Sequence, residues 1–207
     1  ADGDNNLHIG ITSNSTGIAL KATGNHFSII DGNSNRSSAG NTLHTHLGRW
    51  NGTQVASMSF VAGTDTTNKD DGVITFSTSS ADNLAEKVRI DSSGRMGIGT
   101  SSMGSYDSTS DNFVIRSSGS TGMTISGSTG GDCQLAFSNG EDTGVEGILT
   151  YQHGSNEFLL AGIESDSTLA FRTGNDKRMI IDSSGLISLA TTTTANARLF
   201  VNPNVDG

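Results

Sequence analysis

The chain of 207 residues has little cysteine, proline, tryptophan or tyrosine: one Cys, one Pro, one Trp and two Tyr. Because Cys133 is alone, no disulfide can form within one chain, and we expect a small buried side chain there rather than a nucleophile. Long apolar runs are also missing. The longest, Phe158–Ile163, is far shorter than the roughly 20 residues of a membrane span. The sequence therefore predicts no insertion into a membrane.

Basic residues are scarce as well. Lys and Arg number 12 against 21 Asp and Glu, which gives a formal net charge of −9. An acidic chain repels the phosphate backbone of nucleic acids and the surface of anionic membranes. Nucleic-acid binding is therefore not expected.

Hydrophobic residues make up only 32% of the chain, whereas there are 27 glycines. A chain so poor in apolar side chains has difficulty offsetting its conformational entropy by burying its own surface. Its apolar residues nevertheless come in short alternating runs bounded by Gly, Asn and Asp, which indicates order. A core shared between several chains reconciles the two observations.

The alternation has a period of two almost everywhere. Ile74 and Phe76 fall on one face of a run, and Leu135 and Phe137 on one face of another. Turn dipeptides such as Asn51-Gly52 separate the runs, and both of their residues accept the positive φ of tight hairpins. The pattern predicts an all-β fold with many short strands.

A repeat organises these runs. "EKVRIDSSGRMGIGT" (86–100) and "DKRMIIDSSGLISLAT" (176–191) share Ile-Asp-Ser-Ser-Gly, and upstream residues 13–22 match residues 118–127. We predict a first β module at 1–99, a linker at 100–112, a second module at 113–193 and a C-terminal connector at 194–207. Asp91 and Gly94 suit a turn. A catalytic Asp91–Ser92 pair is disfavoured, because no positioned base accompanies it in either copy.

The signature Arg89–Gly94 followed by Gly97–Thr100 resembles the recurring signature of bacteriophage tail fibres and related virion appendages. The second copy keeps Ile-Asp-Ser-Ser-Gly but has Ser188–Thr191 in place of Gly-Ile-Gly-Thr. The ending, residues 194–207, resembles the stretch that often leads into a self-cleaving intramolecular chaperone, whose Ser-Lys cleavage chemistry is absent here.

The resemblance implies an elongated, intertwined, parallel homotrimeric fibre in the extracellular virion. We expect a non-enzymatic, structural and adhesive tail-fibre segment that takes part in host attachment and receptor recognition. Its partners would be other virion tail proteins and a host cell-surface glycan or outer-membrane receptor. Two alternatives stay open: a polysaccharide-degrading tailspike, and a purely structural appendage of a virion or a bacterial surface.

Recognition residues are sought where the two copies differ. The loops at 63–72 and 138–144 interrupt the repeat and carry polar groups, and an exposed aromatic ring beside a turn could stack on a sugar. The candidate receptor-binding residues are Trp50, Asp65, Lys69, Asp70, Asp71, Glu141 and Asp142.

His44 and His46 are the candidate metal ligands. Residues i and i+2 share a face of a strand, so three chains around an axis could offer six imidazoles to a transition metal. Similar His-x-His pairs hold iron in the tips of T-even phage long tail fibres. The alternation fits slightly better with the opposite arrangement, in which Leu43, Thr45 and Leu47 face the core and both histidines face water.

Overall fold

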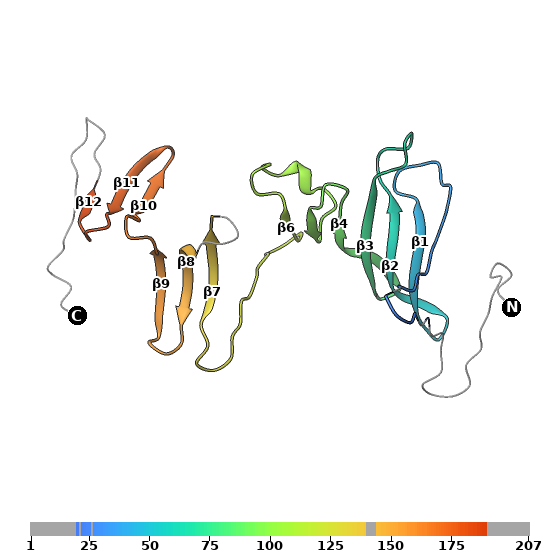
Figure 1. The fold of residues 1–207 in the computed structure, drawn as a ribbon, viewed down its shortest axis with the longest axis horizontal. Helices are drawn as coiled ribbons and strands as arrows, with labels where there is room; N and C mark the ends of the chain where they lie inside the picture. Colours follow the sequence, from blue (N-terminus) through green and yellow to red (C-terminus); the bar gives the residue numbers. More distant parts are fainter. Residues whose placement is uncertain (1–19, 21, 26, 140–143, 190–207) are drawn as a thin grey trace. The chain divides into compact units, whose positions relative to one another are not determined.

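The computed structural model describes residues 20, 22–25, 27–139 and 144–189. Within these ranges the chain forms β-strands, loops and one 3-10 helix, η1 (Met103–Ser105), and no α-helix. The all-β prediction is confirmed. The chain divides into two compact units, Ala1–Gly122 and Met123–Gly207 (Figure 1). Among the described residues, no helix has the length and apolar character needed to cross a membrane.

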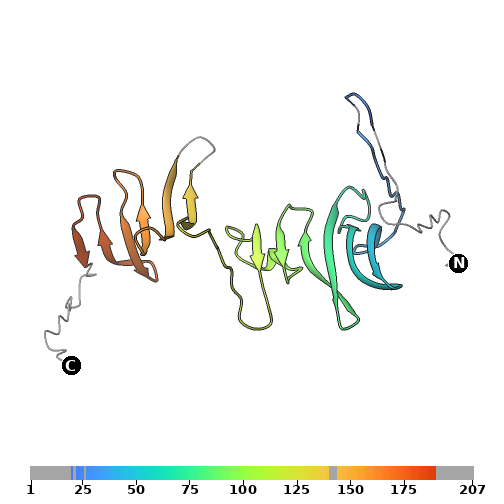
Figure 2. The same cartoon turned by 90° about the horizontal axis from the view of Figure 1, so that it is seen from below.

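The first unit contains one six-stranded sheet whose spatial order follows the chain order. Its strands are β1 (Thr42–Trp50), β2 (Thr53–Ala62), β3 (Gly72–Ser80), β4 (Asn83–Ile90), β5 (Met96–Ile98) and β6 (Phe113–Ile115). Neighbours are antiparallel, except that β5 and β6 are parallel. Figure 2 shows this succession of neighbouring strands from a second direction.

Tight turns join the long strands. Asn51 (φ 47°) and Gly52 (φ 86°) connect β1 to β2, and both have the positive φ of a primed hairpin turn. The predicted Asn-Gly turn is therefore confirmed. Ala81 (φ 50°) and Asp82 (φ 62°) turn β3 into β4 in the same region of φ, which is less favourable for side chains with a Cβ.

One face of this sheet carries two continuous apolar rows. Because directly paired residues project to the same face, the register defines the rows. The first row is His44, Phe60, Ile74, Ile90, Met96 and Phe113, and the second is His46, Met58, Phe76, Val88, Ile98 and Ile115. We call these twelve residues the apolar face. It is poorly covered within one chain: Phe60 is 37% exposed, Phe76 40% and Phe113 50%.

The opposite face holds the buried apolar side chains of the first unit. Among the described residues only Val61, Met103 and Val114 are buried apolar side chains. Met103 is 1% exposed and packs over Gly97, where an added Cβ would lie 2.5 Å from the Met103 sulfur. The segment 99–112 therefore folds back onto its own sheet.

This packing differs from the predicted module boundaries. Residues 100–112 were expected to be a linker and residues 113–193 a second module. In the structure Arg95 donates to Asp111 over 3.0 Å, and β6 pairs with β5, so the expected linker and the first residues of the expected second module, 113–122, belong to the first unit. Apolar alternation could not reveal this, because the contacts depend on one buried Met and one ion pair.

The second unit contains two three-stranded antiparallel sheets. One comprises β7 (Cys133–Ser138), β8 (Val145–Gln152) and β9 (Glu157–Gly162), and the other β10 (Leu169–Thr173), β11 (Asp176–Ile181) and β12 (Ile187–Leu189). Cys133, expected to be buried, is half-buried, and its sulfur accepts a hydrogen bond from the Gly127 N–H at 3.0 Å.

The strands β10–β12 repeat the pairing of β3–β5. Leu169, Ile181 and Ile187 form one row, and Phe171, Met179 and Leu189 form the next. The register shifts after Phe171 on β10, as it does after Phe76 on β3. The second unit thus also presents an open apolar surface, with Phe171 46% and Ile187 58% exposed.

Candidate functional site

The loop 63–72 between β2 and β3 is held by its own two aspartates. The Asp71 carboxylate accepts hydrogen bonds from the Thr64 N–H at 2.8 Å and the Asp65 N–H at 3.0 Å. The Asp65 carboxylate accepts from the N–H groups of Thr67 and Asn68, both at 2.9 Å. These contacts fix the loop without any apolar core of its own.

The hydrogen bonds also set the ionisation of Asp65. The backbone N–H of Asn68, followed by the Asn68 side chain and the Thr67 N–H, lowers the pKa of Asp65 below its ordinary value. Each donor favours the charged carboxylate over the neutral acid. The hydrogen bonds of the loop therefore favour the charged form of Asp65.

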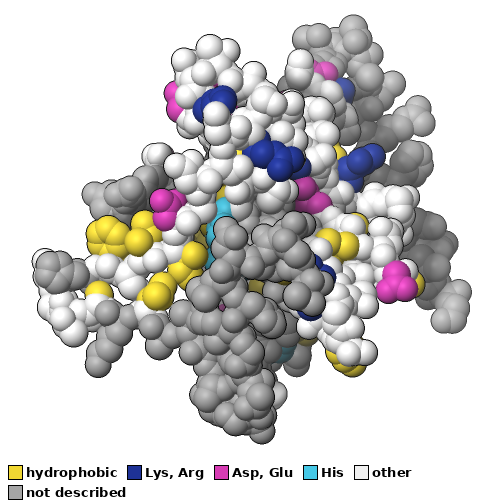
Figure 3. Space-filling model, turned by 90° about the vertical axis from the view of Figure 1, so that its right-hand side faces the viewer, with side chains coloured by type: hydrophobic (Ala, Val, Ile, Leu, Met, Phe, Trp, Pro, Cys, Tyr) yellow, Lys and Arg dark blue, Asp and Glu magenta, His cyan; other side chains and the backbone are white. Residues whose placement is uncertain are grey.

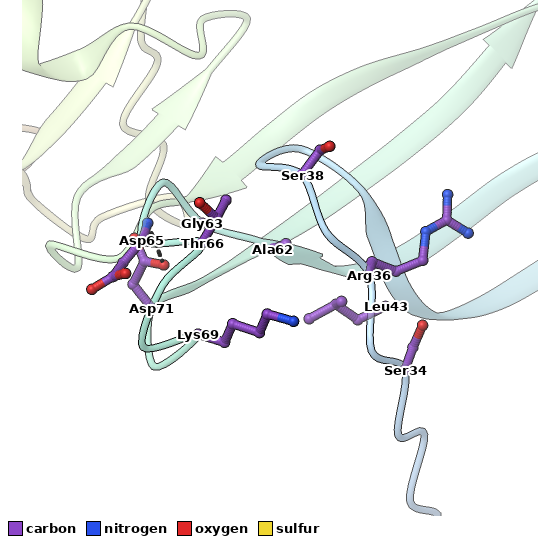
Figure 4. Close-up of a pocket in the computed structure, with 10 residues that line it drawn as sticks. All are labelled: Ser34, Arg36, Ser38, Leu43, Ala62, Gly63, Asp65, Thr66, Lys69 and Asp71. Atoms are coloured by element: carbon purple, nitrogen blue, oxygen red, sulfur yellow. Dashed lines mark hydrogen bonds between the residues drawn. The ribbon is translucent and has the colours of Figure 1, made fainter.

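A small pocket lies between this loop and the segment 34–38 (Figure 4). Lys69 has a positive φ of 57° and places its ammonium 2.5 Å from the Asn35 amide oxygen. The pocket has a volume of about 80 Å³ and is lined by Ser34, Arg36, Ser38, Leu43, Ala62, Gly63, Asp65, Thr66, Lys69 and Asp71. Gly63 packs against Asp71 so closely that a Cβ would lie 2.4 Å from the carboxyl carbon.

The structure brings together only part of the predicted recognition set. Asp65, Lys69 and Asp71 line this pocket, whereas Asp70 is exposed in the same loop and does not line it. Trp50 is 79% exposed at the hairpin between β1 and β2, which is the other end of β2. Glu141 and Asp142 lie outside the described residues.

The sequence did not predict the wall of the pocket formed by Ser34 and Arg36, or the contact of Lys69 with Asn35 between them. They lie 29 to 27 positions before the start of the loop, and the contact from Lys69 to Asn35 joins residues 34 apart. The alternation of apolar residues carries no signal for such a contact, because the segment 34–38 is not a strand.

The two histidines lie on the apolar face, on the opposite side of β1 from Thr45 and Leu47. His44 pairs with Phe60 and its ring stacks on that ring at a centroid distance of 6.0 Å, while His46 pairs with Met58. Thr45 and Leu47 face the opposite side, where Thr45 and Ser59 share a 2.8 Å hydrogen bond. Thr45 and Leu47 thus share the face of the buried Val61, and His46 is exposed within one chain. Burial of the histidine side of β1 against other chains stays a prediction.

The His44 imidazole is left with an unpartnered atom. The two rings meet edge to face with centroids 4.9 Å apart, and Gly32 packs directly against the Nδ1 side of His44. The Nε2 atom of His44 is buried and has no hydrogen-bond partner. No group of three or more His, Cys, Asp or Glu side chains able to hold a metal occurs within the described part of one chain. Within the described residues, His44 and His46 are the imidazoles that lie together on this face.

Figure 3 shows hydrophobic side chains at the surface of the molecule, with histidine beside them. The exposed large apolar side chains of the described residues include Phe60, Phe76, Phe113, Phe137, Phe158 and Phe171. Soluble monomers seldom expose so many large rings, so such surfaces indicate contact with other chains.

The overall architecture resembles two solved structures of bacteriophage T5. The structure of the carboxy-terminal domain of the T5 L-shaped tail fibre matches with a TM-score of 0.59 and 11% sequence identity, over 93% of this chain and 98% of that one. The same domain with its intra-molecular chaperone domain matches with a TM-score of 0.53 and 12% identity, over 93% and 68%.

The fold is like that of a tail-fibre domain. At these identities the likeness concerns the fold alone. No protein-family model matches the chain, and no curated protein matches its sequence. Whatever residues confer specificity must therefore be argued from this chain itself.

Proposed function

We propose that the chain is a structural and adhesive segment of a phage tail fibre, carried on the virion and used in host attachment. The observation that carries the proposal is the likeness to the T5 tail-fibre domain over almost the whole of both chains. The acidic surface and the signature around Asp91 and Asp182 support the same function. The role is non-enzymatic, with recognition provided by groups that bind rather than cleave.

The chain acts as a parallel homotrimer in this proposal. The apolar face of the first unit and the apolar rows of β10–β12 are open within one chain. Three copies around an axis would bury both, which supplies the core that 32% hydrophobic residues cannot supply alone. Light scattering tests the assembly: a trimer is expected, and a stable folded monomer near 21.4 kDa would overturn it.

The receptor-contacting region of the proposal is the loop 63–72 with Trp50 as a second exposed point. The loop is fixed by Asp65 and Asp71, so binding a host glycan or an outer-membrane receptor there would cost little ordering. Trimerisation would present three copies and strengthen weak contacts by multivalency. Other tail proteins would be its partners along the fibre.

Labelled purified protein applied to a panel of bacterial strains tests recognition. Selective binding is expected, and Lys69→Ala together with Trp50→Ala should weaken it, while an exposed control change, Ser155→Ala, leaves it unchanged. Release of reducing ends from capsule or lipopolysaccharide by the purified protein would contradict the non-enzymatic proposal.

The histidine pair fits a transition metal shared by three chains. His44 and His46 lie beside each other on the apolar face, with their ring centroids 4.9 Å apart. Six imidazoles suit first-row metals such as iron. Elemental analysis of the native trimer is expected to show iron or another such metal at about one atom per trimer. Its absence, or equal metal in His44→Leu/His46→Leu, would reject the site.

A further inference from the structure

The face of the first sheet opposite to the apolar face is rich in hydroxyl groups. Thr45, Ser59, Thr75 and Arg89 are successive partners across β1 to β4, and Leu47, Ser57, Ser77 and Glu86 form the row beside them. Strand pairing thus brings side chains from four strands onto one recessed surface. The residues that carry it belong to the interior of the sheet, so their positions are set by the backbone ladder.

These side chains line a groove with a volume of about 520 Å³. Binding sites for small organic ligands fall in the range of about 300–1,000 Å³. The pocket beside Lys69, at about 80 Å³, has room for a substituent rather than for a whole sugar ring. The groove is therefore the place in the first unit where a chain of sugar rings could lie.

The hydroxyl groups in the groove differ in whether they hydrogen-bond to other protein groups. Thr45 and Ser59 hydrogen-bond each other at 2.8 Å, and Thr45 also donates to the Met58 carbonyl at 3.2 Å. Within the described part of the chain, the hydroxyls of Ser57 and Ser77 make no hydrogen bond to protein and are not among the buried unpartnered atoms, so they are open to solvent. A hydroxyl both donates and accepts, as the hydroxyls of a sugar do.

The charges of the groove cancel. Arg89 donates to both oxygens of Glu86, at 2.7 and 2.8 Å, and this hydrogen bonding raises the pKa of the Arg89 guanidinium. With the pair satisfied, neither an anionic nor a cationic ligand gains a free counter-charge. Leu47 and Leu84, 43% and 36% exposed, offer apolar contacts to the C–H faces of a ring.

We infer that this hydroxyl-lined groove binds a neutral oligosaccharide. The inference rests on the proposed function, in which the apolar face is buried against the other two chains and the groove on the opposite face stays open. It assigns recognition to strand residues centred on Ser57 and Ser77, in addition to the loop 63–72.

The test measures binding of the purified native protein to immobilised neutral oligosaccharides of three to six units, built from glucose, galactose, mannose or N-acetylglucosamine. At least one is expected to bind, and Ser57→Ala/Ser77→Ala should weaken it five- to tenfold or more, as expected for two lost hydrogen bonds. The matched control, Thr78→Ala/Ser80→Ala, removes two hydroxyls from the opposite face of β3 and should change the affinity less than twofold.

Three outcomes would overturn the inference. The first is no binding to any oligosaccharide of the panel, and the second is an equal loss of affinity in the groove and control variants. The third is strong protection of the groove residues of β2 and β3 from hydrogen exchange in the ligand-free protein that is lost when its chains dissociate. That result would place a second copy of the chain in the groove. Selective attachment to bacteria that is unchanged by Ser57→Ala/Ser77→Ala would reject the groove and leave the proposed function standing. Oligosaccharide binding by a protein that attaches to no bacterial strain would support the groove and reject the proposed function in host attachment.

Discussion

The turns at residues 91–95 and 182–186 share their backbone geometry and differ in one side chain. In the first, the Asp91 carboxylate accepts from the N–H groups of Ser93 and Arg95, both at 3.0 Å. In the second, the Asp182 carboxylate accepts from Ser184 and Leu186, both at 2.9 Å. Gly94 and Gly185 have positive φ of 78° and 80° and complete the turn in both. The repeated Asp-Ser-Ser-Gly is therefore a turn former.

The two turns differ in the contacts that their fifth residue makes with the rest of the chain. Arg95 reaches Asp91 at 2.8 Å and Asp111 at 3.0 Å, which ties the segment 99–112 back to the sheet. Its counterpart in the second turn, Leu186, is 63% exposed. The shared residues thus carry the shape of the turn, and the variable residue decides whether the following chain is anchored. The predictions below separate these two roles.

Met103→Ala should have the largest effect, because it removes the most buried side chain of the anchored segment. Loss of a buried Met typically costs about 2–5 kcal/mol. Hydrogen exchange on the intact protein is expected to show faster opening of β5 and β6, with β10–β12 unchanged. Equal acceleration in both units would mean that the segment does not stabilise the first unit in particular.

Asp91→Ala should destabilise its hairpin more than Asp182→Ala destabilises the other. Each change removes a carboxylate that accepts hydrogen bonds from two backbone N–H groups. Only the first change also leaves Arg95 without its nearer carboxylate. A typical intramolecular hydrogen bond contributes about 0.5–1.5 kcal/mol net, and an exposed ion pair adds about 0–1 kcal/mol. We expect a loss of about 2–3 kcal/mol for the first change and about 1 kcal/mol for the second in urea unfolding. Equal losses would show that Arg95 adds nothing to the turn.

The sequence predicted these hairpins but not their surroundings. Strict alternation in residues 86–90 puts Val88 and Ile90 on one face and Lys87 and Arg89 on the other, and the register agrees for Val88, Ile90 and Arg89. Lys87 is instead the unpaired residue of the bulge between Glu86 and Val88, which brings Glu86 to the Arg89 side. A bulge moves every residue beyond it by one face, and no local pattern marks where it occurs.

The candidate sites also differ in how much of each could be predicted from the sequence. Asp65 and Asp71 were predicted as receptor contacts because they lie in a polar loop that interrupts the repeat. That both carboxylates also accept hydrogen bonds from the backbone of this loop was not predicted. The positions of His44 and of the groove residues Ser57 and Ser77 depend on which strands pair and in which register. That information lies in contacts between distant residues, so it became visible only with the sheet.

The dependence of stability on pH should differ between the native protein and Arg95→Leu, the variant that gives the first turn the leucine of the second. Partial burial acts to raise the pKa of Asp91, but hydrogen bonds from the Arg95 side chain and from the Arg95 and Ser93 N–H groups outweigh it, so the pKa of Asp91 is lowered. A lowered carboxyl pKa stabilises the fold above the unfolded-state value of about 3.9, and this stability is lost as the pH falls through the folded pKa.

Arg95→Leu places the residue of the second turn into the first and removes the largest of the three favourable hydrogen bonds. The variant should be less stable than the native protein at pH 7, and the difference should shrink as the pH falls below about 4. Urea-unfolding midpoints at pH 7, 5 and 3, followed by circular dichroism, measure this. A difference that stays constant over the range would show that Arg95 acts by packing and not through the charge of Asp91.

The reciprocal change, Leu186→Arg, should have the smallest effect. It offers Asp182 a guanidinium in the position that Arg95 has beside Asp91, but the second unit has no described counterpart of Asp111 to complete the bridge. An exposed ion pair adds about 0–1 kcal/mol, less at high salt. Urea midpoints at low and high salt should therefore differ from the native protein by little. A gain as large as the loss from Arg95→Leu would show that the pair with the turn aspartate suffices and that the anchored segment contributes nothing to it.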